Sequence, residues 1–255
     1  MKTIDAKNEF LNMIAGEMVL VPGKKIFLER INDYIKEMPG KHPVFNTFSQ
    51  IRDLNPLELI ITDFKHSDVK EICPMPVIAY SETLHNSDPT ASVDMTITYE
   101  KTMSEEFAFS FDEEIKLGVT TKVKCGIPLI AEGEIEVTGE ISAGAHQSWT
   151  ATKEKSWKGE RTIHVNAGSS VSVQVTIQNE TLNSSFTAKI FLGPDTCMVV
   201  GVSVASDPDS YREFPIPLTV LLGGPEALAQ MFVSFSGSFN GTEGVTVDTT
   251  VTPIR

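Results

Sequence analysis

The sequence predicts an elongated, mainly β protein with long antiparallel strands and a small α-helical head at its N-terminus. Apolar residues recur at helical spacing over roughly the first 60 residues, and at every second position from Val93 onward. The alternating register that starts at Val93 persists as far as Cys125, about 33 residues, whereas a typical strand has ~5–6. Long strands that share a register predict a rod-shaped molecule rather than a compact sandwich.

Three apolar stripes predict the helices of the head. A short stripe consists of Phe10, Leu11 and Ile14. The clearest stripe consists of Phe27, Ile31, Tyr34, Ile35 and Met38, and Pro39-Gly40 follows it as a stop signal. A third stripe, before Asn55-Pro56, consists of Val44, Phe45, Phe48, Ile51 and Leu54. We expect all three to be helical and to face the core, because most amphipathic helices simply pack.

Alternating rows of apolar residues predict the strands of the shaft. The first row consists of Val93, Met95, Ile97, Tyr99, Phe107, Phe109 and Phe111, and we expect a bend near residues 103–106 to divide it. Later rows lie within 163–177 and 233–251, and the row Phe186, Ala188, Ile190 and Leu192 switches to even positions. Each row predicts an antiparallel strand with one buried face.

Residues 112–149 form the most informative segment, because two alternating arms flank a glycine-bracketed turn at 126–133. The odd positions of the arms carry a row of large apolar residues: Ile115, Leu117, Val119, Val123, Ile135, Val137 and Ile141. The even positions are polar and include Lys122, Lys124, Glu134, Glu136 and Glu140. The pattern predicts an amphipathic β-hairpin.

The register of this hairpin can be predicted from its charges. If the chain folds about Leu129, paired positions add up to 258, so that Lys124 faces Glu134 and Lys122 faces Glu136. A shift by one residue would set apolar against charged side chains, so this register, or one displaced by two, is favoured.

Two interpretations of the hairpin remain open. Each arm has about 11 residues, close to the ~9–11 that a transmembrane β-strand needs, and apolar-out, polar-in alternation is typical of a membrane barrel. Alternatively, the hairpin lies on the shaft of a soluble β protein with its apolar face buried there.

Composition excludes several function classes. A net charge of −13 argues against sequence-independent nucleic-acid binding and against electrostatic docking on anionic lipid. The histidines have no metal-ligand spacing, and no nucleophile elbow, Walker loop or dinucleotide fingerprint occurs, so we expect no enzyme activity and no cofactor. Charges within residues 1–9 break up any signal-peptide apolar region, so we expect synthesis in the cytoplasm.

Several motifs resemble those of a known toxin family. Residues 124–137, KCGIPLIAEGEIEV, followed by Gln147-Ser148-Trp149, resemble the insertion loop of aerolysin. Residues 165–173, VNAGSSVSV, resemble the strand that follows this hairpin in clostridial epsilon-toxin and mosquitocidal toxins, and 237–251 resemble their closing strand. The resemblance covers residues 90–252, and the chain is also similar to bacillar parasporal crystal proteins, including parasporins.

The resemblance implies an aerolysin-like β-pore-forming toxin that binds a cell-surface receptor, is activated by proteolysis, forms a homo-oligomer and inserts one hairpin per subunit. It also implies storage as a parasporal inclusion. The hairpin tip would comprise Ile127, Pro128, Leu129 and Ile130, and the lumen would be lined by Lys122, Lys124, Glu134, Glu136 and Glu140. The alternative is a non-toxic crystal protein of the same fold.

The expected domains are a receptor-binding head, an elongated shaft and the hairpin. The head comprises residues 1–85, joined by 205–230. The shaft, with a C-terminal β-sandwich, comprises 86–111, 150–204 and 231–255. The hairpin comprises 112–149.

Overall fold

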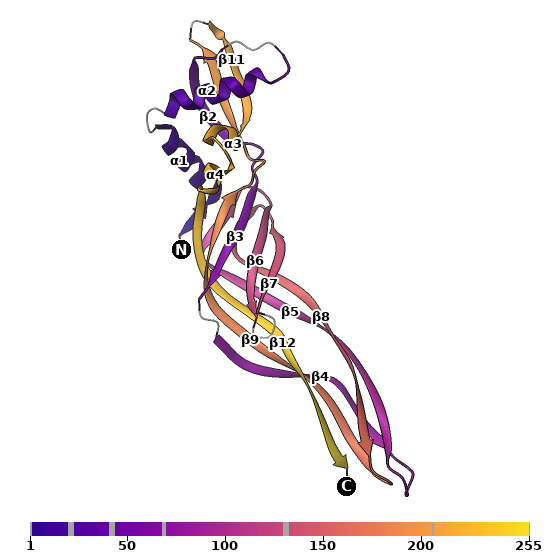
Figure 1. Ribbon diagram of the computed structural model, residues 1–255. Coiled ribbons are helices and arrows are strands. Elements are labelled where there is room, and N and C mark those ends of the chain that lie inside the picture. The colour runs from indigo at the N-terminus through magenta and orange to yellow at the C-terminus, as the bar shows by residue number, and fades with distance from the viewer. Residues whose placement is uncertain are drawn as a thin grey trace.

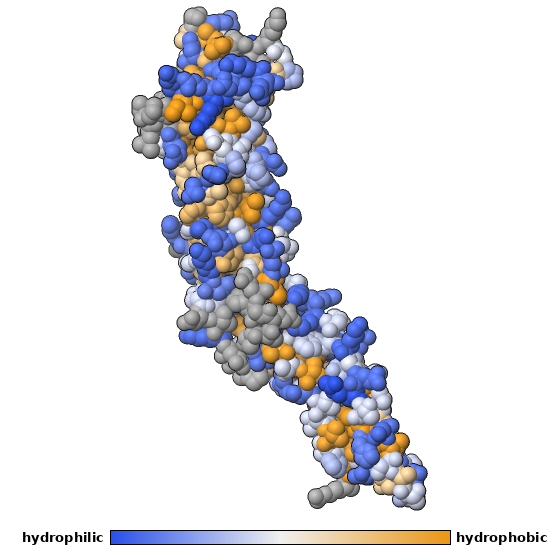
Figure 2. All heavy atoms as spheres, viewed as in Figure 1, coloured by the Kyte–Doolittle hydropathy of each residue, from blue (hydrophilic) through white to orange (hydrophobic). Residues whose placement is uncertain are grey.

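The molecule is a rod in which a small head of helices and short strands sits on a long, bent β shaft (Figure 1). The structure is a computed structural model, and it describes residues 2–19, 23–40, 44–67, 70–129, 133–205 and 207–254. On the face shown in Figure 2, hydrophobic residues are exposed in separate patches between hydrophilic ones. This shape confirms the predicted elongated, mainly β class.

The head combines four helices and three strands among the described residues. They are α1 (Ala6–Val19), α2 (Gly23–Lys36), α3 (Leu218–Leu222), α4 (Pro225–Ala229), β2 (Thr47–Leu54), β10 (Cys197–Val204) and β11 (Asp207–Pro217). The strands pair in the order β11-β10-β2. The first two apolar stripes of the sequence fall on α1 and α2, where Phe10, Ile14, Ile31 and Ile35 are buried. These two helical predictions are confirmed.

The third stripe is a strand, β2, and its helical prediction is wrong. Phe48, Ile51 and Leu54 of β2 pair with Val202, Val200 and Met198 of β10, respectively. The register shifts twice between these pairs, so β2 contains two bulges. Each bulge lengthens the usual period of two to a spacing of three, which imitates a helix.

The shaft is built from nine strands among the described residues. They are β1 (Thr3–Asp5), β3 (Leu59–His66), β4 (Lys70–His85), β5 (Val93–Leu117), β6 (Thr121–Leu129), β7 (Gly133–Ile141), β8 (Gly144–Val165), β9 (Ser170–Leu192) and β12 (Phe232–Ile254). The sheet order is β1-β5-β12-β9-β3-β6-β7, with β4 added to β9 and β8 added to β5.

The lower shaft is a two-layer sandwich. Strand β12 pairs with β9 along its whole length but with β5 only over Gly237–Gly241. Below this short ladder the sheet divides into two layers, one made of β5 and β8 and the other of β4, β9 and β12. A separate core fills the space between the layers and includes Ile97, Tyr99, Val165, Val173 and Val175. In this part of the described chain, β4, β5, β8 and β12 each pair on one side only.

Residues 59–85, which the sequence places in the head, pair with β9 as β3 and β4 of the shaft. Their alternation is hidden in the sequence by irregularities. Asp63 has a φ of 56° where the β3 register shifts, and Pro74 and Pro76 lie in β4, which has two shifts of its own. Proline is tolerated there because β4 is an edge strand.

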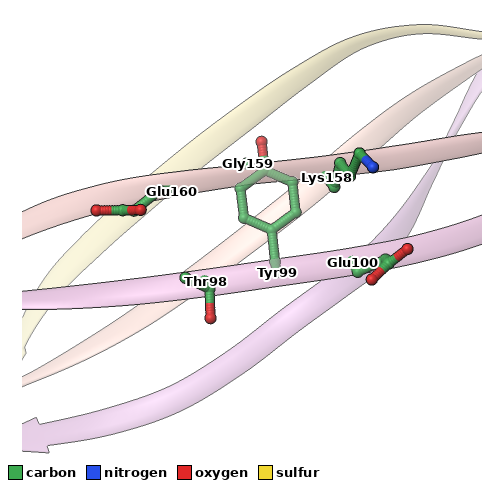
Figure 3. A pocket seen from close by; sticks show the side chains of 6 residues that line it. All are labelled: Thr98, Tyr99, Glu100, Lys158, Gly159 and Glu160. Carbon is green, nitrogen blue, oxygen red and sulfur yellow. The ribbon is translucent and has the colours of Figure 1, made fainter.

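The β5–β8 ribbon keeps one register from Val93–Val165 to Ser110–Ser148, in which paired positions add up to 258. Strand β5 runs through residues 103–106 without a break, so the predicted division there is wrong. In this ribbon the ring of Tyr99 on β5 covers its partner Gly159 on β8 (Figure 3). A Cβ atom added to Gly159 would lie 2.6 Å from the hydroxyl oxygen of Tyr99. The glycine therefore makes room for the ring beside an open hollow of about 430 Å³.

A buried polar cluster marks the point where β12 leaves β5. Glu105 is 3% exposed, and its Oε1 accepts a hydrogen bond from the Gly244 amide at 3.1 Å and lies 3.9 Å from Lys155 Nζ. Its Oε2 is buried without a hydrogen-bond partner among the described residues. Burial raises the pKa of the Glu105 carboxyl above its ordinary value of 4.5, and the nearby Glu243 carboxylate adds to this effect, against the opposing influence of the Gly244 amide and Lys155.

We expect the Glu105→Gln variant to be more stable than the wild type at pH 8. Because the folded state binds this proton more tightly than the unfolded chain, wild-type stability falls as the pH rises from 4.5 through the folded-state pKa. The glutamine side chain does not ionise, so the variant keeps its stability as the pH rises. The difference in unfolding free energy between variant and wild type should therefore shrink below pH 4.5. Urea unfolding at several pH values measures it; an advantage that is constant with pH would contradict the assignment.

Candidate functional site

The β6–β7 hairpin (Thr121–Ile141) lies along the upper shaft, next to β3 (Figure 1). Its pairs run from Thr121–Ile141 to Leu129–Gly133, and paired positions add up to 262. The predicted sum of 258 is therefore wrong for this hairpin by four residues, although apolar positions still face apolar positions. The predicted register belongs to the β5–β8 ribbon instead.

The hairpin is shorter than the segment 112–149 that the sequence singled out. Ile115 and Leu117 belong to β5, where Ile115 pairs with His146 of β8 and with Ile4 of β1. Between Ser110 and Ile115 the β5–β8 register is irregular, because four residues on β5 stand against one on β8. Residues 118–120 then lead into β6.

The predicted apolar face points into the main core of the upper shaft. Ile115, Leu117, Val123, Val137 and Ile141 are each at most 8% exposed, and Val119 and Ile135 pack against the same cluster. Cys125 and Ile127 are also fully buried. The predicted tip lies partly outside the described residues: Ile130 is not described, and only the backbone is described for Pro128, Leu129 and Glu134.

The opposite face is polar and exposed. Lys124 Nζ contacts Glu136 Oε2 at 2.9 Å, diagonally across the hairpin, and Glu140 lies directly opposite Lys122. Lys122 Nζ contacts Glu58 Oε1 at 2.9 Å, and this carboxylate raises the pKa of the ammonium group. The expected Lys124–Glu134 and Lys122–Glu136 pairs are not Cα partners here.

Few backbone interactions attach the hairpin to the shaft. Its ladder with β3 has two paired positions, Ile60–Lys122 and Ile61–Val123, and β7 pairs with β6 alone among the described strands. Short ladders with exposed edges belong to the least stable parts of a fold. The hairpin is therefore held mainly by side chains.

His66 supplies one of these side-chain contacts. Its Nε2 lies 3.1 Å from the Gly126 carbonyl of the hairpin, and its Nδ1 lies 2.9 Å from Ser184 Oγ of β9. A carbonyl only accepts, so in the neutral ring Nε2 donates and Nδ1 accepts from the serine. The ring also packs edge-on against Phe239, with centroids 5.2 Å apart.

Trp149 supplies a second contact. Its indole stacks on Phe109 with ring centroids 5.2 Å apart, and a Cβ at Gly139 of the hairpin would lie 2.8 Å from its Cζ2. The sequence marked Trp149 within a motif without indicating its partner. Neither His66 nor Glu58 was predicted as a contact, because no local pattern pairs residues so far apart in the chain.

The surface around the hairpin contains a hollow, and two further observations concern metal sites and helices. A hollow of about 460 Å³ on its outer face is lined by Ile60, Val123, Gly139, Thr138, Lys122, Lys124 and Glu140. In the described part of the chain, no group of His, Cys, Asp and Glu is arranged to hold a metal ion. Across the same residues, no helix has the length and apolar character to cross a membrane.

Comparison with known proteins gives the family. The model of the family described as Clostridium epsilon toxin ETX/Bacillus mosquitocidal toxin MTX2 matches residues 25–217, about three quarters of the chain. The chain belongs to this toxin family. The match includes the hairpin, β3 and the β5–β8 ribbon, and it confirms the resemblance seen in the motifs. No curated protein sequence matches the chain.

Two solved structures can be compared with the fold of this member of the epsilon toxin/mosquitocidal toxin family. The Mpp75Aa1.1 β-pore-forming protein from Brevibacillus laterosporus superposes with a TM-score of 0.50 at 15% identity, over 99% of this chain and 90% of that chain. A non-toxic crystal protein from Bacillus thuringiensis gives a TM-score of 0.48 at 11% identity, over 91% of this chain and 96% of that chain. At such identity the first likeness establishes the fold.

Proposed function

We propose that this member of the epsilon toxin/mosquitocidal toxin family is a β-pore-forming toxin that inserts its β6–β7 hairpin. It would bind a cell surface through its head, assemble into a homo-oligomer after proteolytic cleavage, and contribute one hairpin per subunit to a membrane barrel. The observation that carries the proposal is a continuous apolar hairpin face held to the shaft by two ladder positions and a few side chains.

The apolar face makes the hairpin compatible with the lipid interior. Within β6 and β7 the face comprises Val123, Ile135, Val137 and Ile141, which would contact lipid after insertion. Ile115, Leu117 and Val119 precede β6 and would follow the hairpin into the lipid. Because most of these side chains are already buried in the core, the transfer exchanges one apolar environment for another rather than removing them from water. Assembly must therefore also contribute, by satisfying the backbone groups that a lone hairpin would leave unpaired in lipid.

The polar face would line the lumen. Lys122, Lys124, Glu134, Glu136 and Glu140 alternate with the lipid-facing set, as in a membrane barrel. The tip residues Ile127, Pro128, Leu129 and Ile130 would cross the bilayer first and anchor in the far leaflet. Before insertion, the Glu58 contact of Lys122 would have to break.

A leakage assay tests this function. Trypsin-nicked protein is added to dye-loaded vesicles of phosphatidylcholine, phosphatidylethanolamine and cholesterol and to a panel of cultured insect and mammalian cells. We expect dye release together with an SDS-resistant oligomer. A nicked protein that stays monomeric and releases no dye from any of these membranes would instead indicate the rival, a non-toxic crystal protein of the same fold.

A further inference from the structure

Two registers meet in the β5–β8 arm. The long β5–β8 ladder pairs positions that add up to 258, whereas the β6–β7 hairpin, which joins the same two strands, pairs positions that add up to 262. A single continuous hairpin cannot hold both registers without an irregularity. Most of the change lies where residues 111–114 of β5 stand against Gln147 alone on β8, after which Ile115–Leu117 pair with β8 at a sum of 261. The last step of one residue lies between the Leu117–Gly144 and Thr121–Ile141 pairs.

Contacts with other elements keep this irregularity in place. Strand β1 pairs in parallel with residues 114–116, and the Glu114 amide donates to the Lys2 carbonyl at 3.0 Å. Ser236 Oγ on β12 donates to Asp112 Oδ2 at 2.6 Å. His66 and Trp149 hold the hairpin at Gly126 and Gly139, and these two contacts belong to the register that adds up to 262.

The direct charge pairs of the hairpin and the position of Pro128 favour the other register. When positions add up to 258, Lys124 faces Glu134 and Lys122 faces Glu136, which gives two opposite-charge pairs directly across the ladder. In the observed register one such pair, Lys122–Glu140, lies directly across the ladder, and Lys124 reaches Glu136 diagonally, while Glu134 faces Pro128 and Glu136 faces Gly126. The register of 258 also moves Pro128 out of a paired strand and into the turn, where proline costs less.

We propose that insertion re-registers the hairpin by four residues, so that β6 and β7 extend the β5–β8 ladder in its own register. The straightened segment 111–114 then pairs with residues 144–147 of β8, and Leu129, which pairs with Gly133 in the resting hairpin, becomes the centre of the turn. This inference rests on the proposed function for the inserted state. The contacts of β1, His66 and Trp149 would hold the hairpin in its resting register.

Two double-cysteine variants, both with a cysteine at position 122, distinguish the two registers. In the Lys122→Cys/Glu140→Cys variant, the two positions are partners in the observed register. In Lys122→Cys/Glu136→Cys they are partners in the other register, and in the resting hairpin they are offset by four residues, about 13 Å along the strand. A disulfide needs Cα atoms within about 7 Å, so each pair reports one register. The Lys122→Cys single variant controls for bonding to the native cysteines.

We expect oxidation of the soluble protein to cross-link the 122/140 pair and not the 122/136 pair. In protein recovered from leaking vesicles the preference should reverse, and the preformed 122/140 disulfide should prevent leakage until it is reduced. Full leakage with the 122/140 disulfide intact would overturn the register change while leaving pore formation established. Absence of leakage by the wild type in the assay above would overturn the proposed function and, with it, the inserted state inferred here.

Discussion

Oxidised Ile60→Cys/Lys122→Cys protein should release no dye from vesicles, and reduction should restore release to that of the wild type. The two residues are Cα partners in the β3–β6 ladder, where neighbouring strands are about 4.8 Å apart, within the range that a disulfide spans. Because this ladder has two positions, one covalent bond there ties the whole hairpin to the shaft. The effect is expected to be complete, since a tethered hairpin cannot reach the membrane.

A second engineered disulfide, placed within the shaft, provides the control. Thr102 and Ser156 are exposed partners in the β5–β8 ladder, with their hydroxyl oxygens 3.0 Å apart. The Thr102→Cys/Ser156→Cys disulfide should leave leakage unchanged, because insertion extends that ladder without opening it. Undiminished leakage of the oxidised 60/122 variant would show that a different segment crosses the membrane.

Phe109→Ala should produce the largest loss of stability of any single substitution in the shaft core. Phe109 is fully buried, and its ring contacts those of Phe64, Phe186, Phe239 and Trp149. Removing a buried phenylalanine ring costs about 3–5 kcal/mol, which lowers the melting temperature of a chain of this size by roughly 6–20 °C. Differential scanning calorimetry of the soluble protein measures the change.

Val44→Ala is the control for this prediction, because Val44 is 69% exposed and should change stability by no more than about 0.5 kcal/mol. The Phe109 variant should also lose the support beneath Trp149, so protection of the hairpin amides from hydrogen exchange should fall more than that of the lower shaft. Equal melting temperatures for the two variants would refute the central role of the cluster.

The shaft could be predicted because its strands are long and bury one face. Residues such as Ile97, Phe107 and Val173 are inward-facing members of an uninterrupted period of two, which a sequence displays directly. Glu105 keeps that period although it is charged, which is why a bend was expected where the strand in fact continues.

Irregular strands could not be predicted, because bulges erase the period. The two bulges of β2 space Phe48, Ile51 and Leu54 by three and so imitate a helix. The shifts in β3 and β4, together with Pro74 and Pro76, concealed two shaft strands within the expected head. The spacing of apolar residues in one strand does not reveal a bulge, because a bulge is defined by how that strand pairs with its partner.

The chemical character of the candidate site was predictable, but its docking was not. Alternation and charge identified which hairpin residues share a face, and the structure brings the apolar set together in one core. The resting register depends instead on contacts with distant elements, such as His66 with Gly126 and β1 with Glu114. These distant contacts outweigh the pairing of opposite charges, which favours the register centred on Leu129.

The one-sided pairing of β4, β8 and β12 makes stacking between whole molecules a hazard for a rod of this kind. Exposed strand edges invite polymerisation, and natural sheets counter it with proline and with lysine or arginine. Pro76 on β4, Lys158 on β8 and Pro253 on β12 occupy such edges. These side chains therefore oppose edge-to-edge pairing of the rods, and we expect their replacement by valine to promote filaments of natively folded molecules, which electron microscopy would detect.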